Sequence, residues 1–196
     1  MPMGAMRLET VRQEASDTGP FTYADLLTTP EDGRRYEVLE GDLVVSPAPK
    51  WSHQRIVAKL TGLVVDADRA GFGIFSPAPT DVIFAPKNVT EPDLLFLAKE
   101  HLGLTTEAGV HGAPDLVIEV VSESSRRRDV LVKRHIYERF GVRFYWIVDP
   151  VEETVRIFEL KDGAYGEPHT LRTGDRLGCP LFPGIELDVV RLFQEP

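Results

Sequence analysis

The chain has 196 residues, 42% of them hydrophobic and 27% charged, and its formal net charge is −9 at pH 7. These values are typical of one soluble globular domain. No apolar stretch reaches the ~18 residues that a membrane span needs. The single cysteine, Cys179, excludes an internal disulfide and a cysteine-based metal cluster. The negative charge argues against binding of nucleic acid through overall electrostatics, because phosphate neutralisation needs lysine and arginine.

The sequence divides into a short leader and one domain. Residues 1–20 lack the hydrophobic segment of a signal peptide, so we expect a flexible leader there and a cytoplasmic protein without a membrane anchor. There is no internal repeat and no low-complexity tract. We expect residues 21–196 to form a single domain.

Helical and strand patterns alternate along the first half of the chain. Apolar residues from 52 to 70 recur at helical spacing, and Gly71 is placed to end that helix. Before it, the turn residues 40–42 join two short strands into a hairpin. The expected elements are a helix at 23–27, strands at 36–39 and 43–46, a helix at 52–70, and strands at 81–84 and 94–97, the last two separated by a turn-rich stretch.

The second half predicts a buried strand, a helix and a closing hairpin. Residues 115–121, DLVIEVV, form a nearly continuous apolar run, which is the pattern of a central strand buried on both faces. The next helix is expected to begin at Ser124 or Ser125, to reach about Phe140 and to end at Gly141. The other expected elements are a loop at 101–113, a strand at 143–148, a hairpin of 154–160 with 164–170, and an irregular tail at 177–193. This order predicts an α/β fold with a mixed β-sheet flanked by helices and with extra β-hairpins.

Positive charge gathers in one segment of this acidic chain. Residues 124–143 contain seven basic and two acidic residues, so the segment carries +5 and the rest of the chain −14. Arg126, Arg127 and Arg128 are therefore candidate contacts to nucleic acid. The alternative is a solvated helix face, and the sequence leaves both readings open.

Glu119 is the chemical anomaly of the sequence, because it lies inside the apolar run VIEVV. A buried carboxylate is costly unless it is paired, hydrogen-bonded or bound to a metal. Side chains alternate along a strand, so Asp115 shares the face of Glu119 and is a candidate supporting residue. The alternative, an edge-strand glutamate that points to water, conflicts with the apolar residues on both faces.

Asp93 follows Pro92 at the start of the apolar strand expected at 94–97. Pro-Asp is also an ordinary turn pair, so Asp93 gains meaning from Glu119. Two carboxylates near the ends of neighbouring strands can hold a hard cation such as Mg²⁺ or Mn²⁺. Such an ion can activate water and neutralise charge on a phosphate.

Pro92-Asp93 followed by Glu119 resembles the PD-(D/E)XK nuclease motif. Longer phrases resemble a bacterial family of restriction-endonuclease-like proteins labelled Uma, namely EDGRRYEVLEGDLVVSPAP, SHQRIVAKL, EPDLLFL and APDLVIEVVSESSRRRDVLVKRHIYERFGVRFYWIVDP. The resemblance runs from about Phe21 to the C-terminus. It implies a restriction-endonuclease-like core and metal-dependent hydrolysis of DNA, with Asp93 and Glu119 as catalytic residues and metal ligands. It also implies a homodimer.

One motif position departs from the family pattern. Two residues after Glu119, where the motif has lysine, this chain has Val121. The resemblance places the lysine on the following helix, at Lys133, where it would stabilise charge on the phosphate or the attacking water. The alternative is a surface salt bridge between Lys133 and Asp129, four residues apart. Tyr137, one turn later, is a candidate supporting residue that packs and hydrogen-bonds.

Two further residues are candidates at the site. The resemblance places an acid there at Glu37, as a third metal ligand or to orient water, with Glu40 and Asp42 as more turn-like competitors. His53, at the start of the long helix, could bind phosphate or act as a general base, or could simply cap the helix.

Two functional hypotheses remain open at this point. The first is a Mg²⁺- or Mn²⁺-dependent endonuclease that cleaves DNA. The second is a catalytically inactive nuclease fold that serves as a binding or assembly module. The intact acid pair and the relocated lysine favour the first hypothesis, and the missing in-strand lysine and the acidic net charge favour the second. Motifs for nucleotide loops, zinc proteases and thiol redox sites are absent from the sequence.

Overall fold

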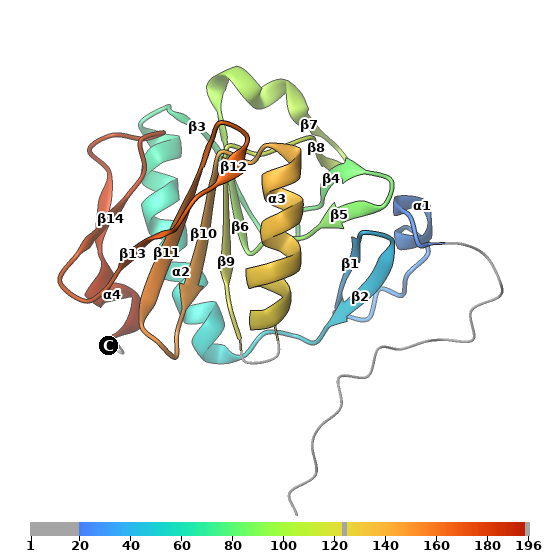
Figure 1. The fold of residues 1–196 in the computed structure, drawn as a ribbon, viewed down its shortest axis with the longest axis horizontal. Coiled ribbons are helices and arrows are strands. Elements are labelled where there is room, and N and C mark those ends of the chain that lie inside the picture. Colours follow the sequence, from blue (N-terminus) through green and yellow to red (C-terminus); the bar gives the residue numbers. More distant parts are fainter. Residues whose placement is uncertain (1–19, 123–124, 195–196) are drawn as a thin grey trace, which may run out of the picture.

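The computed structural model describes residues 20–122 and 125–194, so the expected leader, residues 1–20, lies outside the described part of the chain except for Pro20. The described residues form two larger sheets, a two-stranded sheet and six helical segments (Figure 1). Within the described residues, no helix is both long and apolar enough to cross a membrane.

The main sheet has seven strands. Six of them follow the order β12-β11-β10-β9-β6-β3, and the seventh, β13, pairs with β11. β9 lies between β10, to which it is parallel, and β6, to which it is antiparallel. The sheet is therefore mixed, as predicted. Its strands are β3 (Gly73–Pro77), β6 (Leu94–Ala98), β9 (Leu116–Val120), β10 (Phe144–Asp149), β11 (Thr154–Lys161), β12 (Ala164–Tyr165) and β13 (His169–Leu171).

A second sheet and a small strand pair complete the β-structure. The second sheet has the order β2-β1-β5-β4-β8-β7, and β14 pairs with β15 near the C-terminus. These strands are β1 (Arg35–Leu39), β2 (Asp42–Ser46), β4 (Val82–Ala85), β5 (Asn88–Thr90), β7 (Thr105–Thr106), β8 (Gly109–His111), β14 (Arg176–Gly178) and β15 (Glu186–Asp188).

The helices cover both faces of the main sheet (Figure 1). One face packs against α2 and the C-terminal segment, through apolar residues that include Leu60, Ile118 and Phe182. The other face packs against α3, through Tyr137 and Tyr145 among others, and against the second sheet. The helices are α1 (Tyr23–Leu26), α2 (Trp51–Arg69), the 3₁₀-helix η1 (Lys99–Leu104), the π-helix η2 (Arg128–Lys133), α3 (Arg134–Phe140) and α4 (Val189–Phe193).

The elements with the strongest periodicity are confirmed. The helix expected at 52–70 is α2, displaced by one residue, and the strand expected at 115–121 is β9, which is buried on both faces. Alternate residues of β9 enter different core clusters: Ile118 lies on the side of α2 and Val117 on the side of α3. The closing hairpin is also present, although its second arm is divided into β12 and β13.

Several short elements contradict the sequence predictions. The stretch expected to be turn-rich contains β5, and the loop expected at 101–113 contains η1, β7 and β8. β3 was not predicted, because its Gly and Pro ends and its half-exposed side chains give no alternation. These strands have two to five residues, so their pairing is decided by distant partners rather than by local pattern.

The single α-helix expected up to Phe140 is wrong in its first half. Arg128–Lys133 is a π-helix, and α3 continues from Arg134 until Gly141 ends it in the left-handed conformation, with a φ of 87°. The predicted end at Gly141 is therefore confirmed. Ser124 lies outside the described residues, and the Ser125 hydroxyl accepts a hydrogen bond from the Ser122 N–H. A π-turn offsets side chains by one position, and such turns are frequent at functional sites.

Two glycines offer a test of the packing between β3 and β6. A Cβ atom on Gly73 would lie 2.0 Å from the Leu97 carbonyl oxygen, whereas a Cβ atom on Gly62 in α2 meets nothing within 4 Å. We expect Gly73→Ala to lower the free energy of unfolding by about 1–3 kcal/mol through overpacking. Gly62→Ala should raise it by about 0.5–1 kcal/mol through helix propensity. Urea unfolding measures both; a Gly73→Ala variant as stable as the wild type would contradict the described close approach.

Candidate active site

The buried acids of the sequence gather around one lysine. Glu37 comes from β1, Asp93 precedes β6, Glu119 lies in β9, and Lys133 is the last residue of η2; all four side chains are buried. Only 1% of the Lys133 side chain is exposed, so the alternative of a surface salt bridge with Asp129 is wrong. The π-turn brings both Asp129 and Lys133 to the buried side of the helix.

Lys133 bridges two strands of different sheets. Its Nζ atom lies 2.8 Å from Oε1 of Glu119 in the main sheet and 2.8 Å from Oε1 of Glu37 in the second sheet. Asp129 Oδ1 is farther away, at 3.8 Å. The resemblance placed a lysine from the helix beside Glu119, and the structure brings these two residues together.

Two tyrosines hold this cluster in place. The Tyr137 hydroxyl donates a hydrogen bond of 2.8 Å to Oε1 of Glu119, so that oxygen accepts from both Tyr137 and Lys133. The Tyr145 hydroxyl donates to the backbone carbonyl of Asp129 at 2.9 Å and fixes the π-turn. Tyr137 thus lies at the site, as a residue that positions Glu119.

Asp93 lies next to Glu119 and is held from three directions. The Val120 N–H donates to Oδ2 at 2.8 Å, and Nε2 of His53 lies 3.1 Å from the same oxygen. Arg35 donates to Oδ1 at 2.9 Å. Asp93 therefore ties together β1, β9 and the first turn of α2, and the structure brings His53 into the site as predicted.

Arg35 and Glu91 belong to the site, and the sequence reasoning missed both. Arg35 Nε lies 2.6 Å from Glu91 Oε1, and the Glu91 N–H donates to Glu37 Oε1 at 2.9 Å. The alternation of side chains along a strand could have identified Arg35, because Arg35 lies two residues before Glu37 and on the same face of β1. Glu40, in contrast, forms the β1–β2 turn with a φ of 55°, and Asp42 is exposed in the strand that follows.

The cluster carries a surplus of negative charge. Five carboxyl groups face three permanently cationic side chains, which leaves an excess of two negative charges when all are ionised. The carboxyl groups are Glu37, Glu91, Asp93, Glu119 and Asp129, and the cations are Arg35, Arg128 and Lys133.

The pKa values follow from burial and from this surplus. Burial raises the pKa of Glu119 to about 8, because the attraction of Lys133 is opposed by the neighbouring carboxylates. Burial also raises the pKa of Glu91 to about 7. Burial alone would raise the pKa of Asp93 as well, but the hydrogen bond and charge of His53, with Arg35 and the Val120 N–H, lower it to about 2. The carboxylates hold the pKa of Lys133 above its usual range in spite of burial.

The remaining candidates lie apart from the cluster. Asp115, at the opposite end of β9 from Glu119, accepts hydrogen bonds from the Ala98 N–H and interacts with His101. Its side chain therefore stabilises the η1 region rather than the acid cluster. Of the three arginines predicted to contact nucleic acid, Arg126 pairs with Asp149 and Glu152, Arg128 lies 3.7 Å from Asp129, and Arg127 is exposed.

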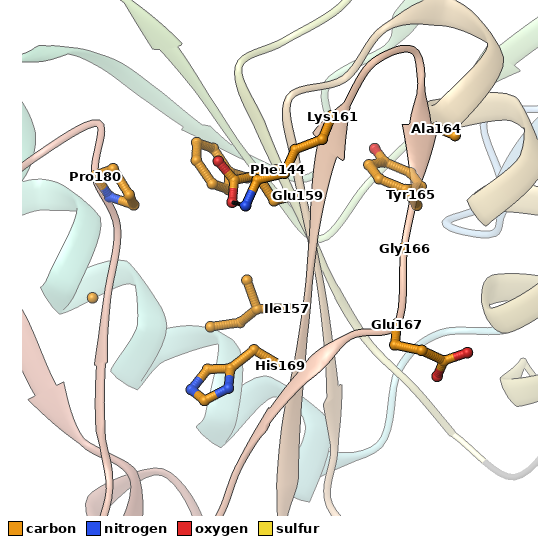
Figure 2. Close-up of a pocket in the computed structure, with 11 residues that line it drawn as sticks. Phe144, Ile157, Glu159, Lys161, Ala164, Tyr165, Gly166, Glu167, His169 and Pro180 are labelled. Atoms are coloured by element: carbon orange, nitrogen blue, oxygen red, sulfur yellow. Dashed lines mark ion pairs between the residues drawn. The ribbon is translucent and has the colours of Figure 1, made fainter.

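A pocket of the described residues lies away from these acids, on the β10–β13 side of the main sheet (Figure 2). Phe144, Ile157 and Tyr165 supply apolar surface, while Glu159 forms an ion pair with Lys161 at 2.7 Å. Phe144 begins β10 and lies at the opposite end of that strand from Asp149. The pocket thus contributes nothing to the acid cluster.

The donor chemistry of the cluster suits a divalent cation. Carboxylate oxygens are the ligands that Mg²⁺ and Mn²⁺ prefer, and Glu37 Oε2 is buried without a hydrogen-bond partner among the described residues. When all five carboxyl groups are ionised, the charge surplus equals the charge of one divalent ion. In the described parts of the chain, however, no three His, Cys, Asp or Glu side chains are placed to hold a metal. Lys133 contacts Glu119 and Glu37, and Arg35 and His53 contact Asp93, so metal binding requires these side chains to move aside.

Comparison with known proteins shows the family of the chain and its fold. Residues 22–190 match the model of the Uma2 family, described as "Putative restriction endonuclease". The chain belongs to the Uma2 family. A crystal structure from Anabaena variabilis, titled as a "putative nuclease belonging to DUF820", has the same fold, with a TM-score of 0.74 and 19% identity over 89% of this chain and 98% of that one. No curated protein matches.

The raised pKa of Glu119 predicts how stability depends on pH. Between the ordinary value of 4.5 and about 8, the folded protein holds a proton that the unfolded chain has released. The free energy of unfolding should therefore fall as pH rises through this window. Glu119→Gln, which cannot ionise, should flatten this dependence. Urea unfolding in EDTA between pH 5 and 8 measures it, and the exposed Glu107→Gln is the matched control that should keep the wild-type slope. A wild-type slope in Glu119→Gln would refute the assignment.

Proposed function

We propose that this Uma2-family chain is a metal-dependent endonuclease that hydrolyses phosphodiester bonds of DNA. The observation that carries the proposal is the meeting of Lys133 with Glu119 and Glu37, at 2.8 Å each, beside the buried Asp93. A lysine among acids at the ends of strands combines a charge for the phosphate with ligands for a cation. The family description and the DUF820 fold support a nuclease.

In this proposal, Asp93 and Glu119 hold Mg²⁺ or Mn²⁺, with Glu37 as a third ligand. When bound, such an ion supplies positive charge at the phosphate and lowers the pKa of water. The two strands that carry Asp93 and Glu119 are adjacent, with Leu94 opposite Ile118, so their side chains reach the same end of the sheet. Because burial raises the pKa of Glu119 to about 8, uptake of a dication would release the proton that this carboxyl group holds at neutral pH.

The other side chains of the cluster position the reacting groups. Lys133 places an ammonium group where charge develops on the phosphate. Tyr137 keeps the Glu119 carboxylate oriented, and Arg35 and His53 hold Asp93. The second ring nitrogen of His53, Nδ1, is buried without a hydrogen-bond partner among the described residues.

Assembly and location stay predictions. A homodimer would present two sites to the two strands of a duplex, which is why the resemblance favours it. Light scattering of the purified chain measures its oligomeric state directly. A cytoplasmic location is likewise an expectation from the sequence.

A second candidate function is a binding or assembly module without catalysis. Its specific support is that Asp93 already has partners on both oxygens and that Val121, at the usual lysine position, is buried in the core. In this reading, the contacts of Asp93 with Arg35, His53 and the Val120 N–H stabilise that carboxylate without a metal. Measurements of cleavage and of metal binding separate the two candidates.

Cleavage tests the proposed activity. Wild-type protein with Mn²⁺ should nick supercoiled plasmid, and EDTA should abolish the nicking. Glu119→Gln, close in size to the native residue, should lose at least about 100-fold in rate, the scale of removing one charge-stabilising group. Glu107→Gln is the matched control and should keep full activity, because its side chain is exposed and remote. Nicking that survives Glu119→Gln would show a contaminating nuclease.

Metal binding provides a readout that does not depend on turnover. Titration calorimetry should show Mn²⁺ binding to the wild type and at least about 10-fold weaker binding to Asp93→Asn. Asp115→Asn is a matched control, since Asp115 is also buried at the start of a strand but pairs with His101 and Ala98. The absence of Mg²⁺ and Mn²⁺ binding in the wild type would favour the inactive module.

A further inference from the structure

Trp51 is a large aromatic side chain left in water beside the acid cluster. The chain has two tryptophans: Trp146 is completely buried in the core, whereas 79% of Trp51 is exposed. Aromatic side chains of this size normally contribute to a core or an interface. Within the described residues no aromatic ring contacts Trp51. Among the described residues, its ring is therefore free to contact a ligand.

The position of Trp51 links it to the candidate active site. It is the first residue of α2, and His53, two residues later, interacts with Asp93 at 3.1 Å. Trp51 and His53 share the first turn of α2, about 3 Å apart along the axis, although side chains two positions apart leave a helix on different sides. Figure 1 shows the start of α2 at the same end of the molecule as the end of β9 and the β10–β11 turn.

Cationic side chains accompany the tryptophan at this end. Lys50 directly precedes Trp51 and is exposed, and the exposed Arg127 lies at the start of the helical segment that follows β9. Glu152, an acid in the β10–β11 turn, is paired with Arg126 at 2.9 Å. Lys50 and Arg127 therefore offer two exposed cations for a phosphate backbone, although the acid cluster and the whole chain are acidic.

We propose that Trp51 stacks on an unpaired base of a DNA strand whose phosphate lies at the acid cluster, so that the substrate is single-stranded DNA or DNA with unpaired bases. This inference rests on the proposed nuclease function and specifies its substrate. It concerns an aromatic residue that makes contact with the base, while Asp93, Glu119 and Lys133 act on the phosphate.

The physics favours an unpaired base over a duplex. In a duplex the faces of internal bases are covered by their neighbours, so an exposed ring can stack only on a base that has left the helix or was never paired. A net charge of −9 also leaves little long-range attraction to the dense charge of duplex DNA. Stacking supplies affinity that does not depend on net charge, and every base offers a π-face.

Intrinsic fluorescence tests the proposal in EDTA, without cleavage. Excitation at 295 nm reports on Trp51 and on the buried Trp146. Twelve-residue oligo(dT) should quench the wild-type signal, while the same strand in a blunt oligo(dT)·oligo(dA) duplex should leave it nearly unchanged. Trp51→Phe should keep only the signal of Trp146, and that signal should not respond to oligo(dT).

Affinity provides the second measurement, by fluorescence anisotropy of labelled oligo(dT). Trp51→Ala should bind about 10-fold more weakly than the wild type, the loss expected for one stacked base, and Trp51→Phe should retain most of the affinity. Leu27→Ala is a matched control, because Leu27 is also a highly exposed apolar side chain but lies just after α1. This variant should bind as the wild type does.

The outcomes separate this inference from the nuclease proposal. Mn²⁺-dependent nicking without a Trp51 effect on oligo(dT) binding would leave the nuclease standing and overturn the stacking role. Quenching and a 10-fold loss in Trp51→Ala without any nicking would support the stacking role on an inactive fold. If Trp51→Ala changes the oligomeric state in light scattering but not the affinity, the ring covers a second copy of the chain and the inference is wrong.

Discussion

A fully buried ammonium group between two carboxylates of different sheets is the interaction on which the site depends. Lys133 contacts Glu119 of the main sheet and Glu37 of the second sheet, so it fixes how the two sheets approach each other. Removing one partner of such a group would leave an uncompensated charge in the core, which is among the most costly changes a protein can undergo. The π-turn includes Lys133, whose side chain is buried in the core. The Tyr145 hydroxyl stabilises the turn through its hydrogen bond to the Asp129 carbonyl.

Asp93 has the complementary role of joining elements that are far apart in the sequence. Contacts from β1, α2 and β9 converge on its two oxygens, and their hydrogen bonds and charges keep its pKa low. The pKa of Glu119 shifts in the opposite direction, because burial raises it and the neighbouring carboxylates oppose the attraction of Lys133. Asp93 and Glu119 therefore differ in pKa because their partners differ. In enzymes, such a difference between two neighbouring carboxyl groups assigns the acid role to one and the base role to the other.

Much of the site could be predicted from the sequence, because the signals lie in neighbouring residues. Glu119 stands out because an acid inside an apolar strand needs a partner, and Pro92-Asp93 marks the start of a buried strand. The family resemblance then pointed to Lys133 and Glu37, and His53 was a candidate from its place at the start of the long helix; the structure brings all three together. Arg35 and Glu91 escaped notice because their role depends on the approach of β1 to the main sheet. Asp115 was grouped with Glu119 by strand alternation, but the two are at opposite ends of β9.

The sequence by itself determined the α/β class, the central strand β9, the long helix α2 and the presence of an acid pair, because periodicity and burial are properties of neighbouring residues. Only the tertiary structure decided the short strands β3, β5, β7 and β8, whose hydrogen bonds go to distant segments. It also decided the π-turn, since one extra residue in a helical turn leaves no mark on the apolar pattern. The partners of Lys133 were settled in the same way: two sheets have to pack before Glu37 and Glu119 come within 2.8 Å of one ammonium group.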